Sequence, residues 1–263
     1  QVCDKIQTMG VWDIINTGKR TSVSTVDMQD IQAMDCALCG QCITHCPTGA
    51  LRERNDTVKV MDAVMDPEQI VIAQIAPVAW GEGFGLSAEE ATVGKMVSAA
   101  RQIGFDYVFD TDFSADLTIM EEGHELLERL LQKKEAKMPM FTSCCPGWVR
   151  FMKSQFPAYV DHLSTAKSPQ QMFGAVAKTY YADNLGVTPD KITCVSIMPC
   201  TAKKYECAVP QVNDSGAERD VDVALTTREF VRMLCAAQVI IETLEEDTFD
   251  EPLGLGTGAG VIF

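Results

Sequence analysis

The residues with the clearest capacity for chemistry are cysteines, of which the 263-residue chain has 11. Four of them form one run, Cys36, Cys39, Cys42 and Cys46, and Pro47 follows directly. A C-x2-C-x2-C-x3-C-P run is typical of bacterial iron-sulfur proteins, in which three thiolates hold one [4Fe-4S] cluster and the fourth reaches another. Structural zinc is the alternative, but soft thiolates at this spacing favour iron and sulfur.

A fourth ligand is needed beside the first three cysteines of the run. Cys3 is the candidate, if it is the last cysteine of an earlier run. By the same logic Cys46 completes a cluster whose other thiolates lie upstream, so we expect the sequence to begin inside a two-cluster ferredoxin-like domain. In the alternative, residues 36–46 supply all four ligands and Cys3 is an unrelated thiol. Either arrangement implies a relay for electrons.

Two further segments place cysteines at the ends of predicted strands. Cys144 and Cys145 follow the apolar segment Met138–Thr142, and Cys200 follows Ile192–Met198. Ligands gather beyond the carboxyl ends of parallel strands, so thiolates from both segments can converge on one metal centre. Taken singly, each cysteine could equally be a buried apolar thiol. Cys194, Cys207 and Cys235 lie outside any motif, and we expect them to be inert thiols that are buried or partly exposed.

Apolar runs alternate with amphipathic stretches after about Asp66, which predicts an α/β domain with a largely parallel sheet. The predicted strands are Ile70–Ala76, Tyr107–Asp110, Met138–Thr142, Ile192–Met198, Val221–Thr226 and Gly260–Phe263. The predicted helices are Leu117–Lys134, Ser168–Asp183 and Thr227–Ala237, the last two with Ser or Thr caps. We therefore expect an iron-sulfur domain over residues 1–62 and a second domain over residues 66–263.

The charge balance narrows the function classes. A net charge of −15 argues against nucleic-acid binding, which needs clustered Lys and Arg.

The longest apolar run, Ile70–Trp80, is too short to cross a bilayer, so no membrane span is expected. Clustered free thiols fit a reducing compartment. The expected location is therefore the cytoplasm, with the periplasm as the alternative.

The two cysteine segments carry a family resemblance. Thr142–Trp148 reads TSCCPGW and Met198–Glu206 reads MPCTAKKYE. They resemble the first two signature motifs of the iron-only, or [FeFe], hydrogenases, TSCCPxW and MPCxxKxxE, at every defined position. The likeness extends through Ala166–Gln171, through Met120–Glu122 and through the cysteine run. It implies a hydrogenase catalytic domain built of parallel-sheet α/β halves, preceded by a partial two-[4Fe-4S] ferredoxin-like domain.

The resemblance also implies an activity and a cofactor. The activity is the reversible reduction of protons to H2, typical of anaerobic hydrogen metabolism. The cofactor is the H-cluster, a [4Fe-4S] cluster joined to a two-iron unit that carries CO, cyanide and an azadithiolate. Cys145 and Cys200 would be ligands of its [4Fe-4S] half. Cys144 would instead exchange protons, and the rest of the relay would comprise Glu122, Ser164, Glu125 and Arg129.

Glu122 and Glu125 share one face of a helix, and without the resemblance they could equally be exposed charges, with Glu125 paired to Arg129. By the resemblance, Lys203 would donate to an iron-bound cyanide and pair with Glu206. The remaining pocket residues implied are Met198, Pro199, Pro77, Val78, Ser168 and Gln170. Val78 is a departure, because relatives often carry Ser there.

A third motif of the family, ExMxCxxGCxxGGGQP, has no match, because no cysteine follows Cys235. We therefore expect the enzyme to continue past Phe263, or another chain to complete the site. The expected partners are ferredoxin or other redox subunits. Two alternatives are a hydrogenase-like iron-sulfur assembly protein and a sensory hydrogenase. The complete set of Cys144, Glu122, Glu125 and Lys203 argues against both.

Overall fold

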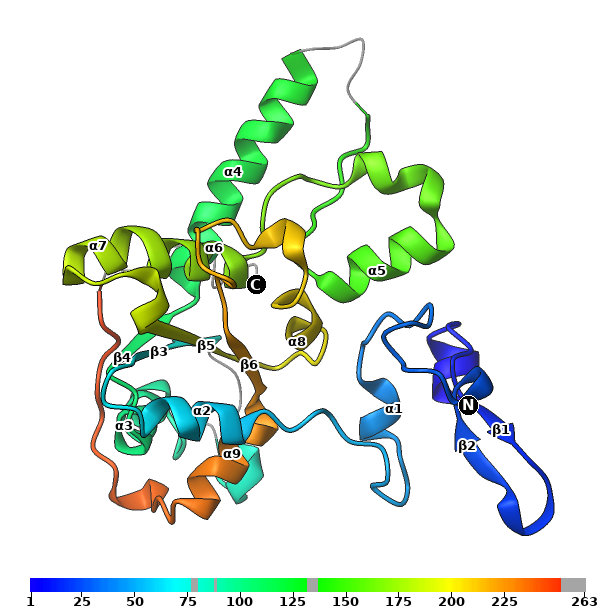
Figure 1. The fold of residues 1–263 in the computed structure, drawn as a ribbon, viewed down its shortest axis with the longest axis horizontal. Coiled ribbons are helices and arrows are strands. Elements are labelled where there is room, and N and C mark those ends of the chain that lie inside the picture. The colour runs from blue at the N-terminus through cyan, green and yellow to red at the C-terminus, as the bar shows by residue number, and fades with distance from the viewer. Residues whose placement is uncertain (77–79, 88, 132–136, 252–263) are drawn as a thin grey trace.

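The computed structural model describes residues 1–76, 80–87, 89–131 and 137–251. A small cysteine-rich unit at the N-terminus lies beside a larger α/β unit (Figure 1). The small unit has only short elements: a π-helical turn η1 (Val2–Ile6), the antiparallel strands β1 (Asp13–Ile15) and β2 (Ser22–Ser24), and helix α1 (Gln41–Thr44). Such a unit can form only a small core, so other contacts must hold it.

The larger unit is built on four strands in the order β4-β3-β5-β6. They are β3 (Ile70–Ile75), β4 (Tyr107–Asp110), β5 (Ile192–Met198) and β6 (Val223–Thr226), and all neighbours run parallel. The predicted parallel sheet is therefore confirmed. Their carboxyl ends meet at one edge, where β5 leads into the MPCTAKKYE segment.

Helices cover both faces of this sheet (Figure 1). On one face lie α2 (Thr57–Val64), α3 (Val93–Ile103) and α9 (Thr227–Ala236); on the other lie α4 (Asp112–Leu131), α6 (Pro169–Val176), the π-helical η6 (Ala177–Tyr181) and α7 (Ala182–Leu185). Alternate residues of β3 point to opposite faces of the sheet. Val71, Ala73 and Ile75 belong to the hydrophobic core on the first face, and Ile72 belongs to the core on the second face. The two cores hold the strand ends, and hence the site, in fixed positions.

Most predicted elements are present with shifted ends. Helix α4 begins five residues before the predicted start at Leu117, and the predicted helix Ser168–Asp183 is three consecutive helical segments, α6, η6 and α7. Ser168 caps α6 by accepting from Gln171 N, and Thr226 caps α9 in a capping box with Glu229, one residue before the predicted start. The predicted strand Gly260–Phe263 lies outside the described residues.

One predicted strand is wrong. Met138–Thr142 forms no strand but only a single parallel bridge between Phe141 and Leu163. Phe141 N donates to His162 O at 2.8 Å, and Ser164 N donates to Phe141 O at 2.7 Å. Pro139 has no N–H to extend the ladder, so the pairing stops after one residue. The bridge nevertheless ties the TSCCPGW segment to Ser164.

The two units meet through contacts to backbone carbonyls. Arg150 of α5 (Pro146–Gln155) donates from Nε to Cys36 O at 2.7 Å and from Nη2 to Met34 O at 2.9 Å. Thr201 Oγ1 donates to Leu38 O at 2.8 Å. Gly40 lies against the same threonine at a φ of +74°, and a Cβ there would stand 2.8 Å from Thr201 Oγ1. The cysteine run is thereby held against the two motif segments.

Candidate iron-sulfur and active site

Four thiols share one cavity in the N-terminal unit. Cys3, Cys36, Cys39 and Cys42 line a cavity of about 170 Å³ together with Trp12. Burial raises the pKa of Cys36 and Cys42, and the neighbouring thiols of the set raise both further. Cysteine sulfurs gathered around one cavity are the donor set that an iron-sulfur cluster requires.

The spacing of these thiols suits a cluster better than one zinc ion. Zinc binds sulfur at about 2.3 Å, so a zinc site draws its ligands tightly together. The four thiols instead surround one cavity. Soft sulfur ligands arranged around a cavity fit a [4Fe-4S] cluster.

Cys46 stands apart from this cavity, which it does not line. Its thiol lies beside the hydroxyl of Thr48 at 3.6 Å. The N–H of Leu51, with the hydroxyl and N–H of Thr48, lowers the pKa of Cys46 to about 7. The structure thus groups Cys3, and not Cys46, with the other three cysteines. That arrangement favours the first of the two ligand sets considered from the sequence.

The two motif segments meet at the start of α5 and of α8 (Lys203–Glu206). Cys145 is the N-cap of α5, and its sulfur accepts from Trp148 N at 3.4 Å. A Cβ on Gly147 would stand 3.0 Å from Ala37 O and 3.8 Å from the Cβ of Ala202. The first turn of α5 therefore lies against both the cysteine run and the segment that carries Cys200.

Lys203 links the two segments by its side chain. Its Nζ donates to Cys144 O at 2.8 Å and pairs with Glu206 Oε2 at 3.0 Å. Burial raises the pKa of the Cys144 thiol, and Lys203 opposes that effect. The predicted Lys203–Glu206 pair is therefore present. Cys144 is held as a protonated thiol at neutral pH, a state in which it can give up a proton.

The predicted relay residues come from α4 and the segment that follows α5. Ser164 Oγ donates to Glu125 Oε2 at 2.8 Å, and Arg129 Nη2 contacts Glu125 Oε1 at 2.5 Å. Burial alone would raise the pKa of Glu125, but Ser164, Thr165 and Arg129 together lower it. Glu125 is thus a carboxylate that accepts from a hydroxyl and a guanidinium.

Glu122 is the less connected member of this set. It is 8% exposed, and its Oε1 accepts from Ser143 N at 3.3 Å. Among the described contacts, none joins Glu122 directly to Cys144 or to Ser164. The structure therefore brings Ser164, Glu125 and Arg129 together in one chain of hydrogen bonds and places Glu122 beside the TSCCPGW backbone.

Gln170 connects the other predicted pocket residues. It accepts from Ser196 Oγ at 2.7 Å and donates to Glu206 Oε2 at 3.1 Å. Ser168 and Met198 are buried nearby, at the start of α6 and the end of β5. Pro199 is exposed and lines a separate cavity of about 260 Å³ with Cys39. Pro77 and Val78 lie outside the described residues.

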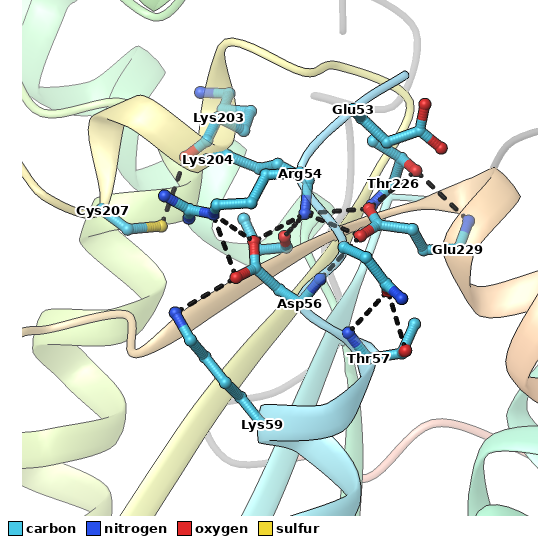
Figure 2. A network of polar contacts seen from close by, with 12 residues as sticks. Glu53, Arg54, Asp56, Thr57, Lys59, Lys203, Lys204, Cys207, Thr226 and Glu229 are labelled. Atoms are coloured by element: carbon cyan, nitrogen blue, oxygen red, sulfur yellow. Dashed lines mark hydrogen bonds and ion pairs between the residues drawn. The ribbon is translucent and has the colours of Figure 1, made fainter. Parts of the chain in front are cut away.

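A buried charge network beside the site was not predicted from the sequence (Figure 2). Lys204, next to the motif lysine, pairs with Asp56 and Glu229 at 2.9 Å each and donates to Ala224 O at 2.7 Å. Arg54 pairs with Asp56 from outside. In the sequence, the only indication of this network was the second lysine of the MPCTAKKYE segment. Its partners lie far away in the sequence and follow no motif spacing.

The unassigned cysteines divide as predicted between buried and exposed thiols. Cys194 and Cys207 are buried, and Cys235 is exposed. Burial raises the pKa of Cys207 to about 12 and that of Cys194 further still. Both buried groups are therefore thiols that do not ionise near neutral pH.

No described helix combines the length and apolarity required to cross a membrane.

Comparison with known proteins identifies the family of the chain. Residues 69–263 match the family described as iron only hydrogenase large subunit, C-terminal domain, and residues 30–52 match the 4Fe-4S binding domain. The NADP-reducing hydrogenase subunit HndD of Solidesulfovibrio fructosivorans is 48% identical over 269 residues, covering 100% of this chain and 46% of that protein. The solved [FeFe]-hydrogenase HydA(deltaEFG) superposes with a TM-score of 0.71 at 39% identity, covering 77% of this chain and 52% of that one.

A relative named for iron-sulfur assembly is more distant. Cytosolic iron-sulfur assembly component 3 of Pongo abelii is 34% identical over 229 residues, covering 82% of this chain and 48% of that protein. The chain thus spans about half the length of the relatives that it matches. The family match covers the sheet, both motif segments and the proposed relay. The chain therefore belongs to the iron-only hydrogenase large-subunit family.

Proposed function

We propose that this chain is part of the catalytic polypeptide of an [FeFe] hydrogenase that interconverts protons, electrons and H2. The observation that carries the proposal is the contact of Lys203 with both Cys144 O and Glu206, next to the Ser164–Glu125–Arg129 chain. An assembly protein needs cluster thiols but has no use for a proton route. The set of acid and base groups therefore favours the enzyme.

The H-cluster, when bound, supplies the open iron and the pendant base at which H2 is formed or split. Cys145 and Cys200 would hold its [4Fe-4S] half, and a segment beyond Phe263, or another chain, would supply the third motif. Lys203 would donate to a cyanide ligand while Glu206 and Gln170 fix its direction. Met198, Pro199 and Ser168, with Pro77 and Val78, would shape the surrounding pocket.

Protons would move through side chains of this chain. The raised pKa of Cys144 keeps it a thiol that can donate and be reprotonated. Glu122, Ser164 and Glu125 would carry the proton toward Arg129, with a water bridging each step that lacks a direct contact. Each group can accept and release a proton within hydrogen-bond reach. The geometry thus supports a route that runs from Cys144 along α4.

Electrons would move through the cluster held by Cys3, Cys36, Cys39 and Cys42 and onward through Cys46. Ferredoxin or other subunits of a multisubunit complex, NAD(P)- or formate-linked, would exchange electrons there. We place the enzyme in the cytoplasm, with the periplasm as the alternative. An iron-sulfur assembly protein or a sensory hydrogenase would keep the clusters but give little or no H2.

The test is Cys144→Ala in the cluster-loaded enzyme, with Cys235→Ala as control. Removing the Cys144 thiol should lower H2 evolution at least about 100-fold, because a positioned proton donor contributes about that much. Infrared bands of iron-bound CO and cyanide should persist in both variants. Cys235 is exposed and outside every motif, so its variant should keep full activity. Unchanged H2 evolution by Cys144→Ala, or wild-type protein without CO and cyanide bands, would contradict the proposal.

A further inference from the structure

Trp12 is an unexplained polar group at the cavity of the four thiols. Its Nε1 is buried and has no hydrogen-bond partner in the structure. A buried indole N–H nearly always finds an acceptor. Trp12 lines the cavity with Cys3, Cys36, Cys39 and Cys42. An N–H without an acceptor in such a place points to a group that occupies the cavity.

The position of the indole limits the choice of acceptor. Trp12 shares the cavity wall with all four thiols, so their sulfurs are the acceptors nearest to the cavity contents. A sulfur that carries negative charge accepts a stronger hydrogen bond than a neutral thiol. Trp12 is therefore placed to donate toward a ligand sulfur once these thiols hold a cluster.

The cationic donors at this cavity are already committed. Lys204 is engaged by Asp56, Glu229 and Ala224 O, and Arg54 by Asp56. Their charges are thus balanced within the protein. Leu38 N donates to Cys36 Sγ at 3.3 Å. The Trp12 N–H is a buried polar group of the cavity wall whose partner is unassigned.

We propose that Trp12 donates a hydrogen bond from Nε1 to a ligand sulfur of the [4Fe-4S] cluster held by Cys3, Cys36, Cys39 and Cys42, and that this bond raises the reduction potential of the cluster. Reduction adds one electron, which increases the negative charge on the ligand sulfurs. A donor therefore stabilises the reduced state more than the oxidised state. Trp12 is thus a positioning residue for electron transfer. The inference rests on the proposed cluster ligands and does not depend on H2 chemistry.

The test is a redox titration of the cluster-loaded protein, followed by electron paramagnetic resonance of the reduced cluster. The signal is assigned by its loss in Cys39→Ser. Trp12→Phe keeps an aromatic ring in the wall but removes the N–H. The equilibrium constant for reduction should fall about tenfold, which for one electron is a shift of about 59 mV to lower potential.

Trp80→Phe is the matched control. Its indole N–H donates to Thr92 O at 3.2 Å, away from the thiols, so its removal should leave the potential unchanged. Wild-type protein labelled with 15N in the indole ring gives a second readout that needs no variant. The reduced cluster should show coupling to one indole nitrogen. Absence of that coupling, or an unchanged potential in Trp12→Phe, would overturn the inference. Absence of the cluster signal itself would instead contradict the ligand assignment.

Discussion

Glu125 is a carboxylate that accepts hydrogen bonds at both of its oxygens. One oxygen accepts from Ser164 Oγ and from both N and Oγ1 of Thr165, and the other accepts from Arg129. Ser164 is 7% exposed, whereas Thr165 is exposed. Both hydroxyls thus reach the same carboxylate, but only the serine approaches it from inside the protein. A proton arriving from Glu122 would have to use the serine.

The two hydroxyls therefore make a matched test of the relay. Ser164→Ala should reduce H2 turnover about 100-fold, the usual size of a lost proton-transfer group. Thr165→Ala removes a hydroxyl bonded to the same oxygen and should leave turnover close to the wild-type value. Both are measured as H2 evolution with the infrared bands of the cofactor as a loading control. Equal losses in the two variants would mean that Glu125 is only held in place by these residues.

At the residue scale, contacts within a local motif could be predicted from the sequence. The spacing of Cys36, Cys39 and Cys42 predicted that their thiols lie together. Lys203 and Glu206 could be paired because they lie three residues apart on one short helix. Trp12 and Arg150 could not be found this way. Trp12 reaches the cavity of the thiols, and Arg150 reaches Cys36 O, only through tertiary packing, and no periodicity encodes such contacts.

At the scale of elements, the sequence predicted what local chemistry determines. The apolar run Ile192–Met198 is β5, and capping residues start α6 and α9. The run Met138–Thr142 looked equally strand-like but has no partner strand along its length. Strand formation depends on a neighbour as well as on composition. Elements fixed by caps and periodicity were therefore predictable, and pairing was not.

Helix α8 is held in place by Lys204, which provides a test at this scale. Lys204→Met should leave Glu229 and Asp56, 0% and 1% exposed, without their shared cation. Losing one partner of a buried ion pair should cost about 3 kcal/mol of unfolding free energy. Lys191→Met removes an exposed pair with Glu68 and should cost less than about 1 kcal/mol. Urea unfolding followed by circular dichroism measures both.

The loss in Lys204→Met should also depend on pH. Burial opposes a low pKa for Asp56, but Lys204, Arg54 and Lys59 together lower it below 3.8. A lowered carboxyl pKa contributes stability above the unfolded-state value, and this contribution disappears as pH falls through the folded-state value. The gap between wild type and Lys204→Met should therefore be full at pH 7 and shrink below about pH 4. A gap that is constant with pH would mean that Lys204 acts only by packing.

At the scale of the whole molecule, the question is what holds the small N-terminal unit on the larger one. The chain connection passes through Asp56, which lies in the buried charge network (Figure 2). Beside the Thr201–Leu38 hydrogen bond, a further attachment is Arg150, whose guanidinium donates to the carbonyls of Cys36, Met34 and Gln32 and stacks over Tyr205 at 4.5 Å. Arg150 thus joins the first motif helix, the second motif segment and the cysteine run at one point.

Removing Arg150 should loosen this attachment without unfolding either unit. Hydrogen bonds from a charged donor contribute about 1.5 to 3 kcal/mol each, less where solvent reaches them. A loss of about 1.4 to 2.8 kcal/mol of docking free energy in Arg150→Met should raise amide exchange rates over residues 34–45 about 10- to 100-fold, because opening of this segment becomes more frequent. Protected amides such as Ile43 N and His45 N, which donate within this segment, report the change by mass spectrometry.

Two assays of the proposed hydrogenase activity separate an effect on the docking of the N-terminal unit from an effect on the active site. H2 oxidation with an external electron acceptor needs both the cysteine-run cluster and the active site, whereas exchange between D2 and solvent protons needs the active site alone. Arg150→Met should therefore slow acceptor-coupled oxidation more than D2 exchange. Lys153→Met, an exposed change one turn further along α5, should affect neither rate nor amide exchange. Equal slowing of the two reactions would place the effect of Arg150 at the active site. Unchanged amide exchange would mean that the charge network and the chain connection suffice to hold the unit.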